Sequence, residues 1–203
     1  IQLWRTPIDG SGERRVTQLP TAHHMVAELP DGDLAWLGLD AAPVDISSLS
    51  LAEPEWLVMA DTLWRGPETQ NGEETGSVLW SYLDDWPHEF FLPCEHLQML
   101  EDRLSWTDVH EWTHSNSLMV VDDVHYFVMI KFHDSGLKIA RATATVVWQM
   151  NGLYSDFSGP GGSQLWNSPG ESLLWTHAHM SHLWLTPDDP TYEGCMVVFD
   201  NGY

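Results

Sequence analysis

Two runs of sequence carry most of the information about the fold: Asp123-Val-His-Tyr-Phe-Val-Met-Ile-Lys-Phe-His-Asp-Ser-Gly136 and Ala140-Arg-Ala-Thr-Ala-Thr-Val-Val-Trp-Gln-Met-Asn-Gly152. Aromatic and β-branched residues recur at every second position of both runs, with Tyr126, Val128, Ile130 and Phe132 on one parity of the first. This period favours a pleated, half-buried surface. We therefore predict two consecutive strands, joined by a turn at Asp134-Ser135-Gly136.

Further strands are indicated on either side of this pair. Their expected ranges are 56–64, 76–83, 117–121, 172–185 and 194–199, with short candidates at 33–38 and 164–166. Between the second and third strands, Leu97, Leu100 and Leu104 have helical spacing, and Glu95 lies in the first turn of the predicted helix 95–106. The pattern predicts an all-β fold, an eight-stranded antiparallel jelly-roll sandwich with one short helix.

The chain divides into two parts by composition. Residues 1–50 are rich in Pro, Gly, Asp and Ser and have weak periodicity, which predicts an extended N-terminal arm or loops. Such a segment is either a loosely packed terminus or an arm that becomes ordered on a neighbouring subunit. Residues 51–203 are expected to form the jelly-roll domain.

The charge of the chain is strongly negative. Thirty acidic residues stand against eight basic ones, for a formal net charge of -22. Such a surface repels phosphate, so we expect no direct binding to nucleic acid and no attraction to an anionic membrane. We find no apolar run of roughly 18 residues, the length that a transmembrane helix needs, and expect no membrane insertion. Adaptation to salt or low pH is another explanation of the acidity.

The termini and the cysteines leave alternatives open. The first residue is Ile1, which is expected after signal-peptide removal, polyprotein cleavage or trimming. Cys94 and Cys195 either pair or remain free thiols.

The order of these elements resembles capsid proteins of picorna-like positive-strand RNA viruses, over roughly residues 51–203. Pro54-Glu-Trp-Leu-Val58 through Trp64 is similar to the first core strand of that family, and Gly76-Ser-Val-Leu-Trp-Ser81 to its second, which a short helix follows. Asp123-Val124 resembles the lead-in to the fifth strand, and residues 140–151 resemble the sixth. The chain departs from the family pattern at Asp122, where Gly is usual, and at Met150-Asn151, which lacks a proline.

The resemblance implies a non-enzymatic structural subunit of an icosahedral capsid, located in the virion. It would assemble with related chains released from a polyprotein, and a host receptor would be a further partner. The alternative is a secreted or halophilic, extracellular β-sandwich that binds carbohydrate or a metal. For carbohydrate, the candidate stacking surfaces are Trp106, Trp112 and Trp166, which lie in or beside expected loops.

His110-Glu-Trp-Thr-His114 matches the H-E-x-x-H pattern of zinc peptidases. That chemistry needs both imidazoles one helical turn apart on zinc, with Glu111 activating a water. The residues that follow have strand patterning, which leaves little helix to hold the motif. We therefore predict no catalytic site here, and His110, Glu111 and His114 remain only candidate ligands.

A second histidine cluster is His177-Ala-His179-Met-Ser-His182. On a strand, His177 and His179 would share a face and could chelate a metal. No glutamate follows at the spacing that a cupin uses, so a histidine-rich subunit contact is the favoured functional interpretation. The paired carboxylates Asp84-Asp85, Asp122-Asp123 and Asp188-Asp189 could bind calcium at subunit junctions. We predict no resident cofactor otherwise.

Overall fold

The computed structural model describes residues 1–9, 11–12, 15–45, 47, 55–69, 71–85, 109–133, 135–150, 179–184 and 195–199. Within these ranges the chain is almost entirely β-structure. The strands are β1 Gln2–Arg5, β2 Arg15–Gln18, β3 His23–Glu28, β4 Asp33–Asp45, β5 Glu55–Pro67, β6 Asn71–Glu74, β7 Ser77–Ser81, β8 Val109–Glu111, β9 Ser115–Val121, β10 His125–Ile130, β11 Ser135–Ala140, β12 Val146–Met150, β13 His179–Trp184 and β14 Cys195–Phe199. One short helix, α1, spans Tyr82–Asp85.

The larger sheet has the order β3-β4-β5-β7, and β8 pairs with β5 in parallel. Strands β4 and β5 have 13 residues each and pair antiparallel along their whole length, from Asp33↔Pro67 to Asp45↔Glu55. The sequence predicts an arm or loops for residues 1–50. Within that segment it also predicts a short strand at 33–38, and this strand is the first part of β4. The structure extends it to Asp45 as an interior strand of this sheet, and the run from Leu34 to Leu39 is buried.

The second large sheet has the order β12-β11-β10-β9, with all pairs antiparallel. For residues 123–152 the sequence predicts two strands, with a turn at 134–136 and one strand over 140–151. The structure has three strands in this region, β10, β11 and β12. The first turn lies earlier, because Ile130 pairs with Ser135. A second turn interrupts the predicted strand, where Ala144 N–H donates to Ala140 O and Ala140 N–H donates to Thr145 O. Alternating residues 140–148 therefore span a hairpin turn, which periodicity alone does not reveal.

Two smaller sheets complete the described part of the chain. One has the order β1-β2-β6 and the other consists of β13 and β14. β6 lies between the strands that the sequence predicts at 56–64 and 76–83. Strands β13 and β14 fall inside the ranges 172–185 and 194–199 that the sequence predicts. The predicted helix 95–106 and the short strand 164–166 lie outside the described residues.

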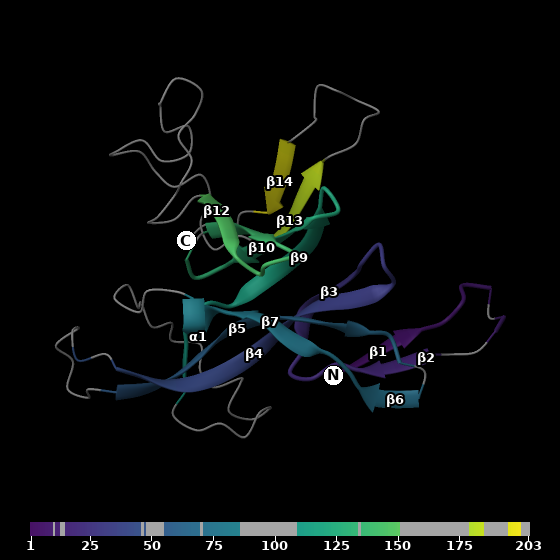
Figure 1. The fold of residues 1–203 in the computed structure, drawn as a ribbon, viewed down its shortest axis with the longest axis horizontal. Helices are drawn as coiled ribbons and strands as arrows, with labels where there is room; N and C mark the ends of the chain where they lie inside the picture. Colours follow the sequence, from purple (N-terminus) through teal and green to yellow (C-terminus); the bar gives the residue numbers. More distant parts are fainter. Residues whose placement is uncertain are drawn as a thin grey trace.

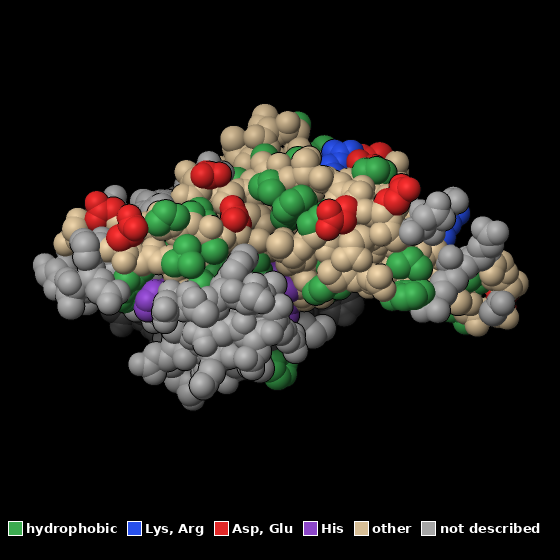
Figure 2. Space-filling model, turned by 90° about the horizontal axis from the view of Figure 1, so that it is seen from below, with side chains coloured by type: hydrophobic (Ala, Val, Ile, Leu, Met, Phe, Trp, Pro, Cys, Tyr) green, Lys and Arg blue, Asp and Glu red, His purple; other side chains and the backbone are tan. Residues whose placement is uncertain are grey.

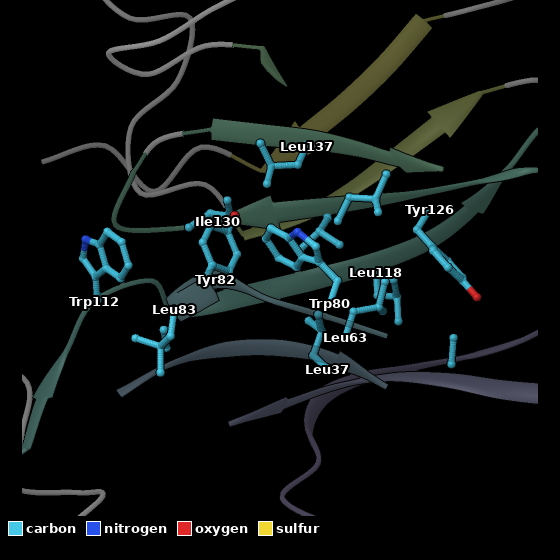
Figure 3. Close-up of a cluster of buried hydrophobic side chains, with 14 of the residues drawn as sticks. Leu37, Leu63, Trp80, Tyr82, Leu83, Trp112, Leu118, Tyr126, Ile130 and Leu137 are labelled. Atoms are coloured by element: carbon cyan, nitrogen blue, oxygen red, sulfur yellow. The ribbon is translucent and has the colours of Figure 1, made fainter. Parts of the chain in front are cut away.

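The two large sheets pack face to face around one core (Figure 1). The core contains Leu37 and Leu63 from the larger sheet and Leu118, Ile130 and Leu137 from the second (Figure 3). Fully burying one such side chain contributes about 1.5–3 kcal/mol, so this shared cluster is what holds the layers together. An all-β architecture of packed sheets is thus confirmed.

The connections among the described strands are those of meanders. Antiparallel neighbours in the sheets are consecutive in sequence, apart from β5 and β7, which β6 separates. A jelly roll instead pairs strands that are distant in sequence. No such antiparallel pair occurs within the described ranges.

Candidate functional site

The site begins with a charged residue in an otherwise apolar strand. Asp61 lies near the middle of β5, in Trp56-Leu-Val-Met-Ala-Asp-Thr-Leu-Trp64, and is only 1% exposed. Removing a carboxylate from water is costly unless it is paired and hydrogen-bonded. Partners from two other segments meet this requirement.

The first set of partners comes from the segment that leads into β9. Ser115 N–H donates to Asp61 Oδ2 at 2.6 Å, and the Thr113 hydroxyl donates to the same oxygen. Thr113 Oγ1 also accepts a hydrogen bond from Asp61 N–H at 2.9 Å. Because β5 belongs to the larger sheet and β9 to the second, these bonds link the two layers.

The second partner is His23, at the start of β3. Its Nε2 lies 2.7 Å from Asp61 Oδ1 and 3.3 Å from the Gly38 carbonyl oxygen. Burial by itself lowers the pKa of His23, but the charge of Asp61 and their hydrogen bond outweigh it and raise the pKa above the ordinary value. Burial likewise opposes ionisation of Asp61, yet His23, Thr113 and Ser115 together hold its pKa at about 2. Both pKa shifts favour the charged forms, so the two residues form a buried ion pair when His23 is protonated.

Two more histidines extend this cluster toward solvent. His23 Nδ1 lies 2.7 Å from His24 Nδ1, and the His24 ring packs edge-on against the His114 ring, with 5.2 Å between centroids. His114 Nδ1 contacts Glu111 Oε1 at 2.8 Å. Both His24 and His114 have positive φ, 51° and 53°. Such backbone costs about 1–3 kcal/mol per residue and persists where surrounding contacts enforce it.

We call His23, His24, Asp61, Glu111, Thr113 and His114 the histidine–carboxylate cluster. It joins β3, β5, β8 and the start of β9. It brings together three imidazoles and two carboxylates, all of which are groups that can bind and release protons. The described residues contain no group of three or more His, Cys, Asp or Glu side chains arranged to hold a metal ion.

The H-E-x-x-H segment does not have the geometry that a zinc peptidase needs. His110 and Glu111 lie on strand β8, and residues 112–114 continue without a helix. The His110 ring stacks on Trp56 with 3.9 Å between centroids, whereas His114 pairs with Glu111. The two imidazoles are thus engaged with different neighbours.

The remaining candidates are placed only in part. His179 and His182 lie on β13, opposite Phe199 and Val197 of β14. The structure does not describe their side chains, and His177 lies outside the described residues, as do Asp188 and Asp189.

Two carboxylate pairs proposed for calcium fall within the described ranges. Asp84 and Asp85 lie in α1. Asp122 and Asp123 occupy the tight turn between β9 and β10 with positive φ. Asp122 binds Lys138 at 2.8 Å and His125 at 2.6 Å, so its negative charge is already matched within the chain.

The tryptophan candidates for sugar stacking also differ from expectation. Trp112 is 1% exposed and belongs to the core that the two sheets share, so it offers no stacking surface. Trp106 and Trp166 lie outside the described residues. Trp4, on β1, is 47% exposed and was not singled out by the sequence.

Sequence reasoning did not nominate His23, His24, Asp61 or Thr113. The usable signal was Asp61 itself, because a lone carboxylate inside a nine-residue apolar strand requires buried partners. The partners could not be named, since they are 38 and 52 positions away.

The chain was compared with protein-family models, with curated proteins and with solved structures. None of these comparisons found a match.

Proposed function

We propose that the chain is a structural assembly subunit, of the kind that forms an icosahedral viral capsid together with related chains. In this proposal the protein is not an enzyme, its partners are other shell subunits, and its location is the virion. The resemblance over residues 51–203 supports it, and a jelly-roll arrangement of the strands is part of it.

The observation that carries the proposal is the edge of the second sheet. Among the described strands, β12 ends the order β12-β11-β10-β9. Its residues Val146 and Val147 are 37% and 50% exposed. An edge strand with exposed apolar side chains invites pairing with another chain, and monomeric proteins usually block such edges with charge or proline. A subunit that assembles would cover this edge.

The surface charge is compatible with that role. Figure 2 shows acidic side chains spread over one face of the molecule, with apolar side chains between them. Most described cations are used inside the chain, because Arg5, Arg15, Arg65, Lys138 and Arg141 all form ion pairs. Contacts between copies would therefore rest on apolar surface rather than on charge attraction.

The test is the particle mass of the native material, measured by mass photometry together with the ratio of absorbance at 260 and 280 nm. We expect particles of megadalton mass that contain nucleic acid and companion chains of similar size. Val147→Glu should abolish or sharply reduce these particles, whereas Ala142→Glu adds the same charge in the neighbouring turn and should leave them intact. A discrete small species without nucleic acid would overturn the proposal.

A second candidate function is supported by Trp4. A half-exposed indole on a strand offers a flat apolar surface on which a sugar ring can stack. An extracellular, carbohydrate-binding sandwich would bind glycans in an array screen, and Trp4→Ala would remove that binding. Unchanged binding in this variant would exclude Trp4 as the surface.

A further inference from the structure

The histidine–carboxylate cluster contains one contact whose chemistry depends on a single proton. His23 Nδ1 and His24 Nδ1 are 2.7 Å apart, which is hydrogen-bond distance. One nitrogen must donate and the other must accept, so only one proton fits between them. When His23 is charged, as the neighbouring Asp61 carboxylate favours, both of its ring nitrogens carry protons and Nδ1 is the donor. His24 must then be the acceptor and neutral.

We propose that the His23–His24 contact is a proton-sensitive joint: it keeps the His24 ring against His114, at the entry to β9, when His24 is neutral, and it releases the ring when His24 gains a proton. Protonation would place two N–H groups face to face and two positive charges on adjacent rings. Because His24 is exposed, its ring can turn out to solvent. The contact with His114 would be lost in the same motion.

The surrounding charges determine how far this release can go. Five titratable groups face the pair or lie within electrostatic reach of Asp61: Asp61 of β5, Tyr82 of α1, Glu111 of β8, His114 and His133. The ammonium of Lys131 lies 5.2 Å from the centroid of Phe132, whose ring packs against His114. Burial raises the pKa of Tyr82 well above its ordinary value and lowers that of His133 to about 4, so both stay neutral near pH 6. A protonated His24 would then lie beside His23, whose positive charge Asp61 favours, and the repulsion between the two rings favours expulsion of His24.

The backbone makes this release local. His24 has a φ of 51°, and the pairing of β3 with β4 is irregular between His23 and Val26. Turning out the ring need not break the regular ladder, which resumes at Val26↔Trp36. The His23–Asp61 pair survives, because Asp61 stays ionised far below this pH range. The joint therefore loosens the edge of the sandwich and leaves its core in place.

The test is hydrogen exchange of the full chain at pH 7.5, 6.5 and 5.5, with rates corrected for the intrinsic effect of pH. An opening that takes up one proton becomes about tenfold more favourable for each pH unit below its titration. We expect protection of the peptides spanning 19–29 and 111–118 to fall by about that factor, while β10 and β11 remain protected. His24→Gln keeps a side chain that can accept the proton of His23, and it should abolish the response to acid.

The matched control is His125→Gln, which removes a histidine from a contact with Asp122 at the other end of β9. This variant should leave the acid-dependent loss of hydrogen-exchange protection in the peptides 19–29 and 111–118 unchanged. The proposal is overturned if acid does not change protection in these peptides, or if His24→Gln responds to acid as the parent chain does. Nitrogen-15 NMR of the imidazoles gives a second readout, in which His24 should be neutral at pH 7.5 with Nδ1 as hydrogen-bond acceptor.

Discussion

Two polar networks join the large sheets, and they differ mainly in burial. In the first, Asp61 binds His23 at 2.7 Å and receives Ser115 N–H at 2.6 Å, and it is 1% exposed. In the second, Asp31 binds Arg65 of β5 at 2.7 Å and Arg141, just after β11, at 3.3 Å. The Asp31 side chain is 46% exposed. The bond lengths are similar, so the comparison isolates what surrounding water does to the value of an ion pair.

The largest effect is expected from removing the buried carboxylate. Asp61→Ala removes the carboxylate that favours the charged form of His23 and deprives Thr113 and Ser115 of their acceptor. Breaking a buried pair in this way typically costs about 3–5 kcal/mol. Urea denaturation at pH 6 should show that loss in the free energy of unfolding. A loss below about 1 kcal/mol would show that water reaches Asp61 and that the two networks do not differ in burial.

Acid should remove the same contribution without mutation. The pKa of Asp61 is about 2 in the folded chain and 3.8 ordinarily, so its stabilisation is present above pH 4 and is lost as pH falls toward 2. The difference corresponds to about 2 kcal/mol. His23 has a raised pKa, so its contribution is full below pH 6.5 and declines as pH rises through its folded value. The buried pair is thus complete between about pH 4 and 6.5.

Denaturation measured from pH 5 down to pH 2 checks this window. Asp61→Asn should be less stable than the parent at pH 5 and should lose less stability on acidification. Equal acid sensitivity of the two chains would mean that other carboxylates dominate the acid response.

A smaller effect is expected at Thr113. Thr113→Val keeps the volume of the side chain but removes a donor to Asp61 Oδ2 and an acceptor for Asp61 N–H. Leaving such buried groups without a partner costs about 1–3 kcal/mol. Thermal unfolding at pH 6 should show a loss of that size, with Thr143→Val as the exposed control. No measurable change would indicate that Ser115 N–H and His23 suffice for Asp61.

The all-β class could be predicted from the sequence, because the period-two pattern of aromatic and β-branched residues in 123–150 and in β5 is a local property of the chain. The same local signal placed β9 and β14 within a residue or two. The local signal did not predict the full length of β4, where tertiary contacts override composition. Residues 33–45 carry Asp, Gly and Pro at intervals, yet they form an interior strand because β5 supplies hydrogen bonds along the whole of β4.

The candidate site was less accessible to sequence reasoning than the fold. The H-E-x-x-H pattern drew attention to His110, Glu111 and His114, but only Glu111 and His114 belong to the cluster. Their partners lie on β3 and β5, and no short motif encodes a contact between residues that far apart. The zinc interpretation assumed a helix at a place where β8 pairs with β5, so spacing alone misassigned the geometry.

The smallest effect is expected at the exposed network, and it sharpens the comparison most. Asp31→Ala removes ion pairs with two arginines, whereas Asp61 has His23 as its one recorded ion-pair partner. Exposed pairs nevertheless contribute only about 0.2–1 kcal/mol each. We expect the free energy of unfolding to fall by less than about 1 kcal/mol. The difference from the parent should shrink further in 1 M NaCl, where the electrostatic screening length is only about 3 Å. The loss from Asp61→Ala should barely respond to the same salt, because water and ions do not reach that carboxylate. If Asp31→Ala instead cost as much as Asp61→Ala, the link between Asp31 and Arg141 would matter for docking the two sheets, and burial would not be what separates the two networks.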